Sequence, residues 1–109
     1  EGGDFSAFQV PSCPHCGTGV LKPDVVFYGE SVPRERVQTC MEAMNRADAL
    51  LIVGSSLMVY SGYRFALAAQ EQGKSIAAIN QGVTRADALL EFKVEADVGQ
   101  TLMALAAAA

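Results

Sequence analysis

The chain has 109 residues, of which 50% are hydrophobic and 18% charged, so it suits one domain or part of a larger one and is too apolar for a disordered tail. Its 12 acidic and 8 basic residues give a net charge of -4 with no basic cluster, which argues against nucleic acid or an anionic membrane as a partner. No apolar stretch approaches the roughly 20 residues that cross a bilayer, and no signal-peptide pattern opens the chain, so we expect a soluble intracellular protein.

The first 22 residues combine glycines and prolines with a cysteine pair and show no helical or strand period, which predicts a loop or knuckle. The pair Cys13-Pro14-His15-Cys16 has three interpretations: half of a structural zinc site, a thioredoxin-like redox dithiol, or plain buried thiols. Zinc is favoured because Gly17 suits a tight turn after the second cysteine, whereas the sequence after Cys16 cannot continue as the helix that a redox motif needs. Structural zinc takes four ligands, so we expect the other two outside this chain.

The next stretch predicts a strand and then a helix. Residues 25–28 are β-branched and aromatic, which indicates a short strand that stops in a turn at Gly29. A helix is expected from Arg34 to about Ala47, because apolar residues at i, i+4 and i+7 form one stripe. The stripe consists of Val37, Met41 and Met44. Cys40 is expected at a core position of the same helix.

Two apolar runs of strand length follow. Residues 49–53 are continuously apolar and end at Gly54, which predicts a parallel strand buried on both faces. Residues 76–79 predict the next buried strand, and residues 92–94 a weak third one.

Three helices are expected among these strands. Ser61 can cap a helix that runs to about Gln72 and stops at Gly73. Thr84 and Asp87 have the spacing of a capping box for a short helix. Asp97 can cap a last helix, whose apolar face would hold Val98, Leu102 and Leu105. Strands that alternate with helices predict a doubly wound α/β sheet.

Ligands of such sheets bind at the carboxyl ends of the strands. Here the strand ends are followed by Gly54-Ser55-Ser56 and by Asn80-Gln81-Gly82. Glycine lets a phosphate approach the backbone, while hydroxyls, an amide and successive N–H groups can bind phosphate and ribose. The first loop suits a nucleotide about as well as it suits a simple strand-to-helix turn. Residues 62–65 likewise suit either a first helical turn or a pocket wall.

Four motifs in this order and spacing closely resemble the sirtuin family. They are Cys-Pro-His-Cys-Gly at 13–17, Leu-Lys-Pro-Asp-Val-Val-Phe-Tyr-Gly-Glu at 21–30, Gly-Ser-Ser-Leu-Met-Val-Tyr at 54–60 and Ile-Asn-Gln-Gly at 79–82. The resemblance covers about Cys13 to Leu105 and corresponds to the second half of the family's catalytic core. Residues 60–65 look most like the subgroup with bacterial enzymes and a mitochondrial member.

The resemblance implies an NAD-dependent protein-lysine deacylase, a transferase that moves the acyl group of a modified lysine to ADP-ribose and releases nicotinamide. It implies the second half of a Rossmann-like sheet at 23–109, preceded by half of a zinc ribbon at 1–22, with Zn on Cys13 and Cys16. The implied NAD contacts are Gly54, Ser55 and Ser56 for ribose and phosphate, Asn80, Gln81 and Gly82 for adenosine, and Val98 for adenine. The implied contacts to the acylated-lysine substrate are a strand of Val26, Phe27, Tyr28, Gly29 and Glu30, and a facing strand of Val59 and Tyr60.

The sequence also departs from the family pattern. The Gly-Ala-Gly-x-Ser loop, the motif with the catalytic histidine and the first cysteine pair are absent, and the only histidine, His15, lies between two expected metal ligands. Ser55 and Tyr28 stand where Thr and Phe are common. We therefore expect this chain alone to be inactive and to need the N-terminal half of its own catalytic core, in the bacterial cytoplasm or the mitochondrial matrix. The alternatives are a non-catalytic nucleotide-binding module and a thiol oxidoreductase.

Overall fold

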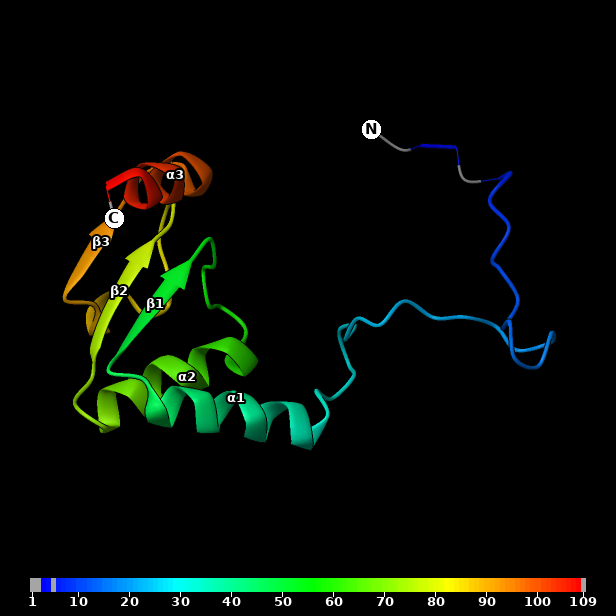
Figure 1. Ribbon diagram of the computed structural model, residues 1–109, viewed down its shortest axis with the longest axis horizontal. Coiled ribbons are helices and arrows are strands. Elements are labelled where there is room, and N and C mark those ends of the chain that lie inside the picture. The colour runs from blue at the N-terminus through cyan, green and yellow to red at the C-terminus, as the bar shows by residue number, and fades with distance from the viewer. Residues whose placement is uncertain (1–2, 5, 109) are drawn as a thin grey trace. The chain divides into compact units, whose positions relative to one another are not determined.

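A computed structural model describes residues 3–4 and 6–108 and divides the chain into two compact units, Glu1–Ser31 and Val32–Ala109 (Figure 1). Residues 1, 2, 5 and 109, which belong to the expected segments 1–22 and 23–109, lie outside the described residues. The division of the chain into those two segments stays a prediction. None of the helices in the described part is long and apolar enough to span a bilayer.

The first unit has almost no regular secondary structure. Its one antiparallel bridge within the described residues joins Ser12 to Val20 on either side of the cysteine pair. The strand expected at 25–28 is wrong, because these residues are irregular and their large side chains are exposed. Apolar residues of high strand propensity still need a neighbouring strand for their backbone hydrogen bonds, and no described residue of this unit supplies one. The turn is confirmed, since Gly29 has a φ of +89° and Glu30 N–H donates to Phe27 C=O at 3.0 Å.

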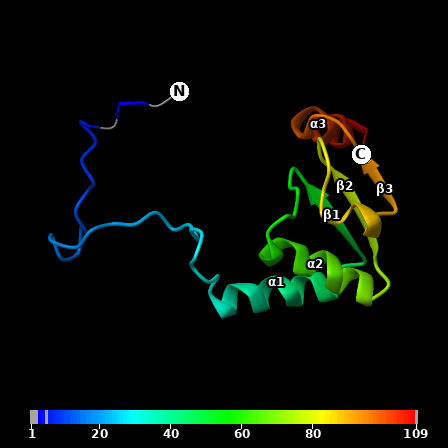
Figure 2. The same ribbon diagram turned by 180° about the vertical axis from the view of Figure 1, so that it is seen from behind.

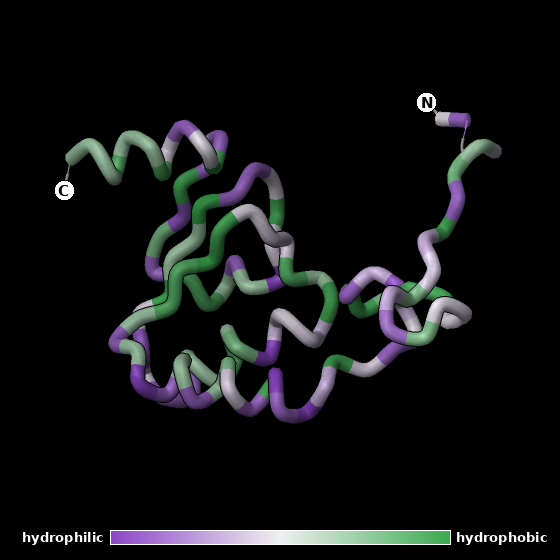
Figure 3. Tube along the Cα trace, turned by 45° about the vertical axis from the view of Figure 1, so that its right-hand side comes forward, coloured by the Kyte–Doolittle hydropathy of each residue, from purple (hydrophilic) through white to green (hydrophobic). Residues whose placement is uncertain are grey.

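The second unit alternates helices and strands. The helices are α1 (Arg34–Arg46), α2 (Tyr60–Glu71) and α3 (Val98–Ala108), with a 3-10 turn η1 (Asp87–Leu89). The strands are β1 (Ala49–Val53), β2 (Ser75–Ile79) and β3 (Phe92–Val94). The three strands form one parallel sheet in the order β1-β2-β3, as the alternating pattern predicted. Hydrophobic residues dominate β1 and β2 (Figure 3).

The core lies between one face of the sheet and the helix pair α1 and α2. Ile52, Ile76 and Ala78 point from the strands toward Ala66 and Ala69 of α2, and all five are buried. Helix α1 packs beside α2 (Figures 1 and 2) and contributes Met44, so the apolar stripe expected on this helix is confirmed there. These small and branched side chains let α2 approach the sheet closely.

Three burial expectations are wrong. Strand β1 is not buried on both faces, because it lies at the sheet edge, where Leu51 is 50% exposed. Cys40 is exposed, although it lies four residues before the buried Met44 on the same helix. Leu102 and Leu105 of α3 are exposed as well, because no described element covers that face of the helix.

The helix boundaries depend on different caps. Gly73, with a φ of +64°, ends α2 as expected, and Lys74 N–H donates to Ala69 C=O at 3.0 Å. Asp97 caps α3 as expected, accepting from Gln100 N–H at 2.8 Å. Ser61 does not cap α2, because the helix begins one residue earlier, at Tyr60, and Val59 in extended conformation precedes it.

Candidate nucleotide site

The carboxyl edge of the sheet brings the two predicted loops together. Val53 and Ile79 are partners in the parallel register, so Gly54 and Asn80 leave neighbouring strands at the same level. Gly54 N–H donates to Ile79 C=O at 2.9 Å, and Asn80 N–H donates to Val94 C=O at 3.1 Å. The edge therefore presents two loops side by side, where ligands of parallel sheets bind.

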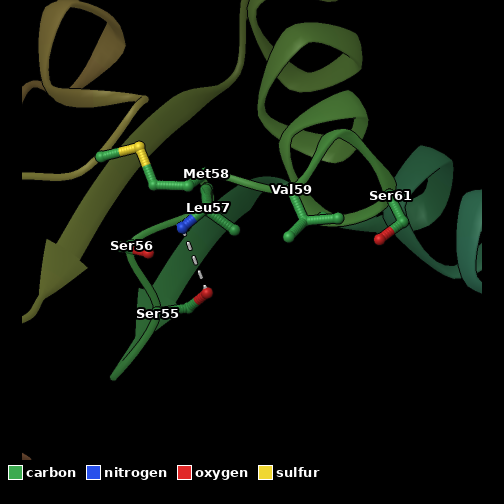
Figure 4. Close-up of a pocket in the computed structure, with 7 residues that line it drawn as sticks. Ser55, Ser56, Leu57, Met58, Val59 and Ser61 are labelled. Carbon is green, nitrogen blue, oxygen red and sulfur yellow. Dashed lines mark hydrogen bonds between the residues drawn. The ribbon is translucent and has the colours of Figure 1, made fainter. Parts of the chain in front are cut away.

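The first loop is a sharp turn. Gly54 has a φ of +60°, and Leu57 has the one positive φ of a non-glycine residue among the described residues, +53°. Ser55 Oγ accepts the Leu57 N–H at 3.3 Å (Figure 4). The loop and the start of α2 line a cavity of about 220 Å³. Its walls are Ser55, Ser56, Leu57, Met58, Val59, Ser61 and Gly62. Gly62 thus belongs both to the first turn of α2 and to a pocket wall.

Val98, expected only from the family resemblance, lies against this loop. A Cβ placed on Gly54 would come within 3.4 Å of Val98 Cγ2. The start of α3 and the turn after β1 are therefore in contact range, and an apolar side chain borders the loop that carries two hydroxyls.

The second loop is held by its own amide and by β3. Asn80 is buried, and its side-chain NH₂ donates to Gln81 C=O at 2.9 Å and to Gly82 C=O at 3.2 Å. Gly82, with a φ of +77°, donates its N–H to Glu95 Oε1 at 3.0 Å. The Asn80 amide therefore shapes the loop, while Gln81 is exposed at its tip.

Lys93 supports the second loop and was not predicted from the sequence. Lys93 Nζ donates to Gly82 C=O at 2.6 Å and pairs with Asp87 Oδ2 at 3.2 Å. Asp87 Oδ1 accepts the Thr84 hydroxyl at 2.6 Å and its N–H at 3.2 Å. These bonds, the Thr84 hydroxyl first, lower the pKa of Asp87. The spacing of Thr84 and Asp87 was visible as a capping box, but nothing in the sequence marked Lys93 as their partner.

The cysteine pair forms a tight turn with sulfur-directed hydrogen bonds. Cys13 N–H donates to Gly19 C=O and Gly17 N–H to Cys13 C=O, both at 2.8 Å. Gly19 N–H donates to Cys16 Sγ at 3.2 Å. A Cβ on Gly19 would lie only 3.1 Å from that sulfur. Hydrogen bonds from the backbone of Thr18, then of Gly19, lower the pKa of Cys16 to about 7.

This turn fits half of a metal site. The thiolate is the form that binds metal, and N–H···S bonds stabilise it. Within residues 3–4 and 6–108, however, no three His, Cys, Asp or Glu side chains cluster as a complete metal site would require. Cys40 lies in the other compact unit.

The residues expected to bind substrate belong to two units and are not strands. Val26 to Glu30 end the first unit as an irregular segment and a turn, in which Glu30 Oε2 accepts Phe27 N–H at 3.0 Å. Tyr28 is 96% exposed. Val59 and Tyr60 stand at the start of α2 in the second unit, and both side chains are exposed. Their pairing with a peptide stays a prediction.

Comparison with known proteins identifies relatives that cover most of the chain. The profile of the Sir2 family matches residues 3–61. A protein of Bordetella pertussis described as an NAD-dependent protein deacetylase is 62% identical over 94% of this chain. One from Xanthomonas campestris pv. campestris with the same description is 61% identical over 90% of it. The chain spans only 37% and 33% of those two relatives.

Solved structures show the same fold. A Sir2 protein bound to an acetylated peptide superposes with a TM-score of 0.76 at 28% identity, over 88% of this chain and 40% of that one. A Sir2 structure with a p53 peptide and NAD⁺ gives a TM-score of 0.75 at 27% identity, over 92% and 42%. The α/β fold with a parallel sheet is thereby confirmed.

Proposed function

Because the chain belongs to the Sir2 family, we propose that it is the C-terminal part of an NAD-dependent protein-lysine deacylase. In the parent protein the acyl group of a modified lysine would pass to ADP-ribose with release of nicotinamide. The chain would supply part of the NAD site, and the rest of the catalytic core would supply the histidine base. By itself the chain would be inactive, since its only histidine, His15, sits inside the cysteine turn.

The observation that carries this proposal is the convergence of the two loops at one sheet edge. The hydroxyls of Ser55 and Ser56 stand beside a turn whose glycine admits a phosphate, and the Asn80 loop follows the adjacent strand. Val98 adds an apolar contact that suits a purine face. These polar and apolar groups lie outside the carboxyl ends of the strands, where parallel sheets bind their ligands.

A segment exchange tests the proposal. The 102-residue matching segment of the Bordetella pertussis deacetylase is replaced by this chain, and deacetylation of an acetyl-lysine peptide is followed with and without NAD. We expect NAD-dependent activity from the chimera and none from the chain alone. A folded chimera that binds NAD but never deacetylates would contradict the proposal.

A matched pair of serine variants locates the site within the chimera. Ser55→Ala removes a hydroxyl at the proposed ribose and phosphate site, so the KM for NAD should rise several-fold. Ser75→Ala removes a hydroxyl at the start of β2, where it donates to Glu91 Oε1 at 2.8 Å, and should leave the KM unchanged. Equal effects of the two variants would place the NAD site elsewhere.

We also propose that Cys13 and Cys16 hold half of a structural zinc site. The tight turn, the N–H···S bond and the lowered pKa of Cys16 support thiolate ligands, and the other two ligands would come from the rest of the parent. The chimera should contain one zinc per chain by atomic absorption. Cys16→Ser should lose it, and Cys40→Ser should retain it.

Segments 26–30 and 59–60 are proposed to bind the acylated-lysine protein substrate. Both present exposed apolar side chains that an extended peptide could contact. Variants of Val59 and Phe27 in the chimera should raise the KM for peptide and leave that for NAD unchanged.

One observation favours a second function, a thiol oxidoreductase, because such enzymes need a cysteine of lowered pKa. The lowered pKa belongs to Cys16 in a turn, whereas thioredoxin-like motifs place the reactive cysteine at a helix start. Reduction of insulin by dithiothreitol in the presence of the chain distinguishes the two, since a deacylase fragment should not accelerate it.

We propose a reducing compartment, the cytoplasm of a bacterium or the mitochondrial matrix; the bacterial relatives support the former.

A further inference from the structure

Arg85 follows the second loop of the candidate nucleotide site in the chain and contacts the first loop through space. It lies between the Asn80 loop and η1, yet its contacts reach back to the loop after β1. Its backbone N–H donates to Ser56 C=O at 2.8 Å, and its guanidinium Nη1 donates to Met58 C=O at 3.1 Å. The guanidinium carbon also stands 4.4 Å from the centroid of the Tyr63 ring in α2. One residue thus binds the first loop at two carbonyls and the helix that follows it at a ring.

The loop that Arg85 contacts contains an unfavourable backbone conformation. Leu57, between the two carbonyls, has a φ of +53°, a conformation that side-chain-bearing residues rarely adopt. Such a conformation costs free energy and persists only where surrounding contacts enforce it. Within the loop one bond does so, from Leu57 N–H to Ser55 Oγ at 3.3 Å. The Leu57 side chain also packs against the core, and Arg85 adds hydrogen bonds to the carbonyls of Ser56 and Met58 on either side of it.

Arg85 is itself placed firmly. Its neighbours Thr84 and Ala86 are both buried, and Thr84 is tied to Asp87 by two hydrogen bonds. The guanidinium is planar, so it can stack on Tyr63 and donate to a carbonyl at the same time, which a lysine ammonium cannot do. The backbone of Arg85 is therefore held in place by its neighbours, and its guanidinium is suited to both contacts.

We infer that Arg85 is a positioning residue, which fixes the spacing between the Ser55–Ser56 loop and the Asn80–Gly82 loop so that one ADP-ribose moiety can span both. The inference rests on the proposed NAD site and adds to it a residue that need not touch the ligand. Because the Met58 carbonyl that Arg85 binds directly precedes Val59, the same contact also sets the start of the segment proposed to face the substrate peptide.

Two measurements on the 109-residue chain test this. Amide hydrogen exchange reports whether the loop is held: Arg85→Ala should speed exchange at Leu57 about tenfold, the effect of losing a hydrogen bond and a ring contact. Calorimetry with ADP-ribose reports the consequence, and the affinity should fall by a similar factor. Arg85→Lys, which keeps the charge, should restore little of either, because it cannot stack and donate in one plane.

The control is Arg46→Ala, an exposed arginine at the end of α1, which should change neither measurement. Global destabilisation would also speed exchange at the backbone N–H of Asn80, which donates to Val94 C=O. Loss of the Arg85 contacts alone should leave exchange at that N–H slow. Unchanged Leu57 exchange in Arg85→Ala would overturn the inference. If ADP-ribose binds neither wild type nor variant, the nucleotide site of this chain is what fails, and the Leu57 exchange still decides whether Arg85 holds the loop.

Discussion

Gly54 shows how one residue sets the turn at the candidate site. Its φ of +60° belongs to the left-handed region, and its Cα faces Val98 at the start of α3. A side chain there would be strained in the backbone before any contact is considered. The turn after β1 therefore depends on glycine.

We predict that Gly54→Ala lowers the free energy of unfolding by about 1–2 kcal/mol, the cost of a left-handed alanine. Urea unfolding followed by circular dichroism measures it. Gly99→Ala is the matched control, because Gly99 is in the first turn of α3 without positive φ and alanine there should stabilise by about 0.5–1 kcal/mol. If both variants changed the free energy of unfolding in the same direction, backbone conformation at Gly54 would not explain the effect.

Asp87 gives the second loop a dependence on pH. The Thr84 hydroxyl, then its backbone N–H and Lys93, lower the pKa of Asp87 below its ordinary value of 3.8. Because the folded state prefers the carboxylate, the stabilisation is complete above pH 3.8 and is lost as the pH falls through the lowered folded pKa.

We predict that the wild type loses more stability than Asp87→Asn when the pH falls from 7 to 3. Every other carboxylate titrates in both proteins, so the difference between their urea midpoints isolates Asp87. The gap between the two should be widest at pH 7 and close toward pH 3. A gap that stays constant with pH would show that the Asp87 charge does not stabilise the loop.

At the scale of elements, local caps determine α3 more than burial does. The helix has no buried residue among those described, and its first turn is held by Asp97 Oδ1, which accepts from Gln100 N–H at 2.8 Å. An N-terminal cap of this kind contributes about 1 kcal/mol.

We predict that Asp97→Ala costs about 1 kcal/mol and frays α3, while Asp97→Asn, which can still accept the N–H, costs a few tenths. Helix content by circular dichroism and the urea midpoint measure both effects. If the alanine variant were as stable as the asparagine variant, other contacts would hold the helix.

The elements divide into those that local sequence determines and those that need a partner. Signals that act within a few residues predicted their elements correctly. The apolar runs predicted β1 and β2, the Met44 stripe predicted α1, and Gly73 and Asp97 predicted the end of α2 and the start of α3. The strand expected at 25–28 failed because a strand is completed only by its neighbour. The loops of the site followed from strand order, but Lys93, Glu95 and Arg85 reach them through space, without a sequence pattern that marks them.

At the scale of the whole molecule, one sheet face is incomplete. Leu51, Ala77 and Phe92 are partners across the three strands, and the outer two are 50% and 61% exposed. Because side chains alternate between faces, this row lies opposite the one that α2 covers. Such an apolar row in a parallel sheet is normally covered by further elements. We expect the rest of the proposed parent protein to cover it.

The test compares one substitution in two settings. In the isolated chain, Phe92→Ser should change the free energy of unfolding by no more than about 0.5 kcal/mol, because the side chain is already largely in water, whereas Ile76→Ala in the core should cost about 2–5 kcal/mol. In the chimera with the Bordetella pertussis segments, Phe92→Ser should become costly, since burial of a large apolar side chain contributes about 1.5–3 kcal/mol. Thermal unfolding of the three variants against their parents measures this. If Phe92→Ser were as mild in the chimera as in the chain, the rest of the parent would leave this face of the sheet exposed.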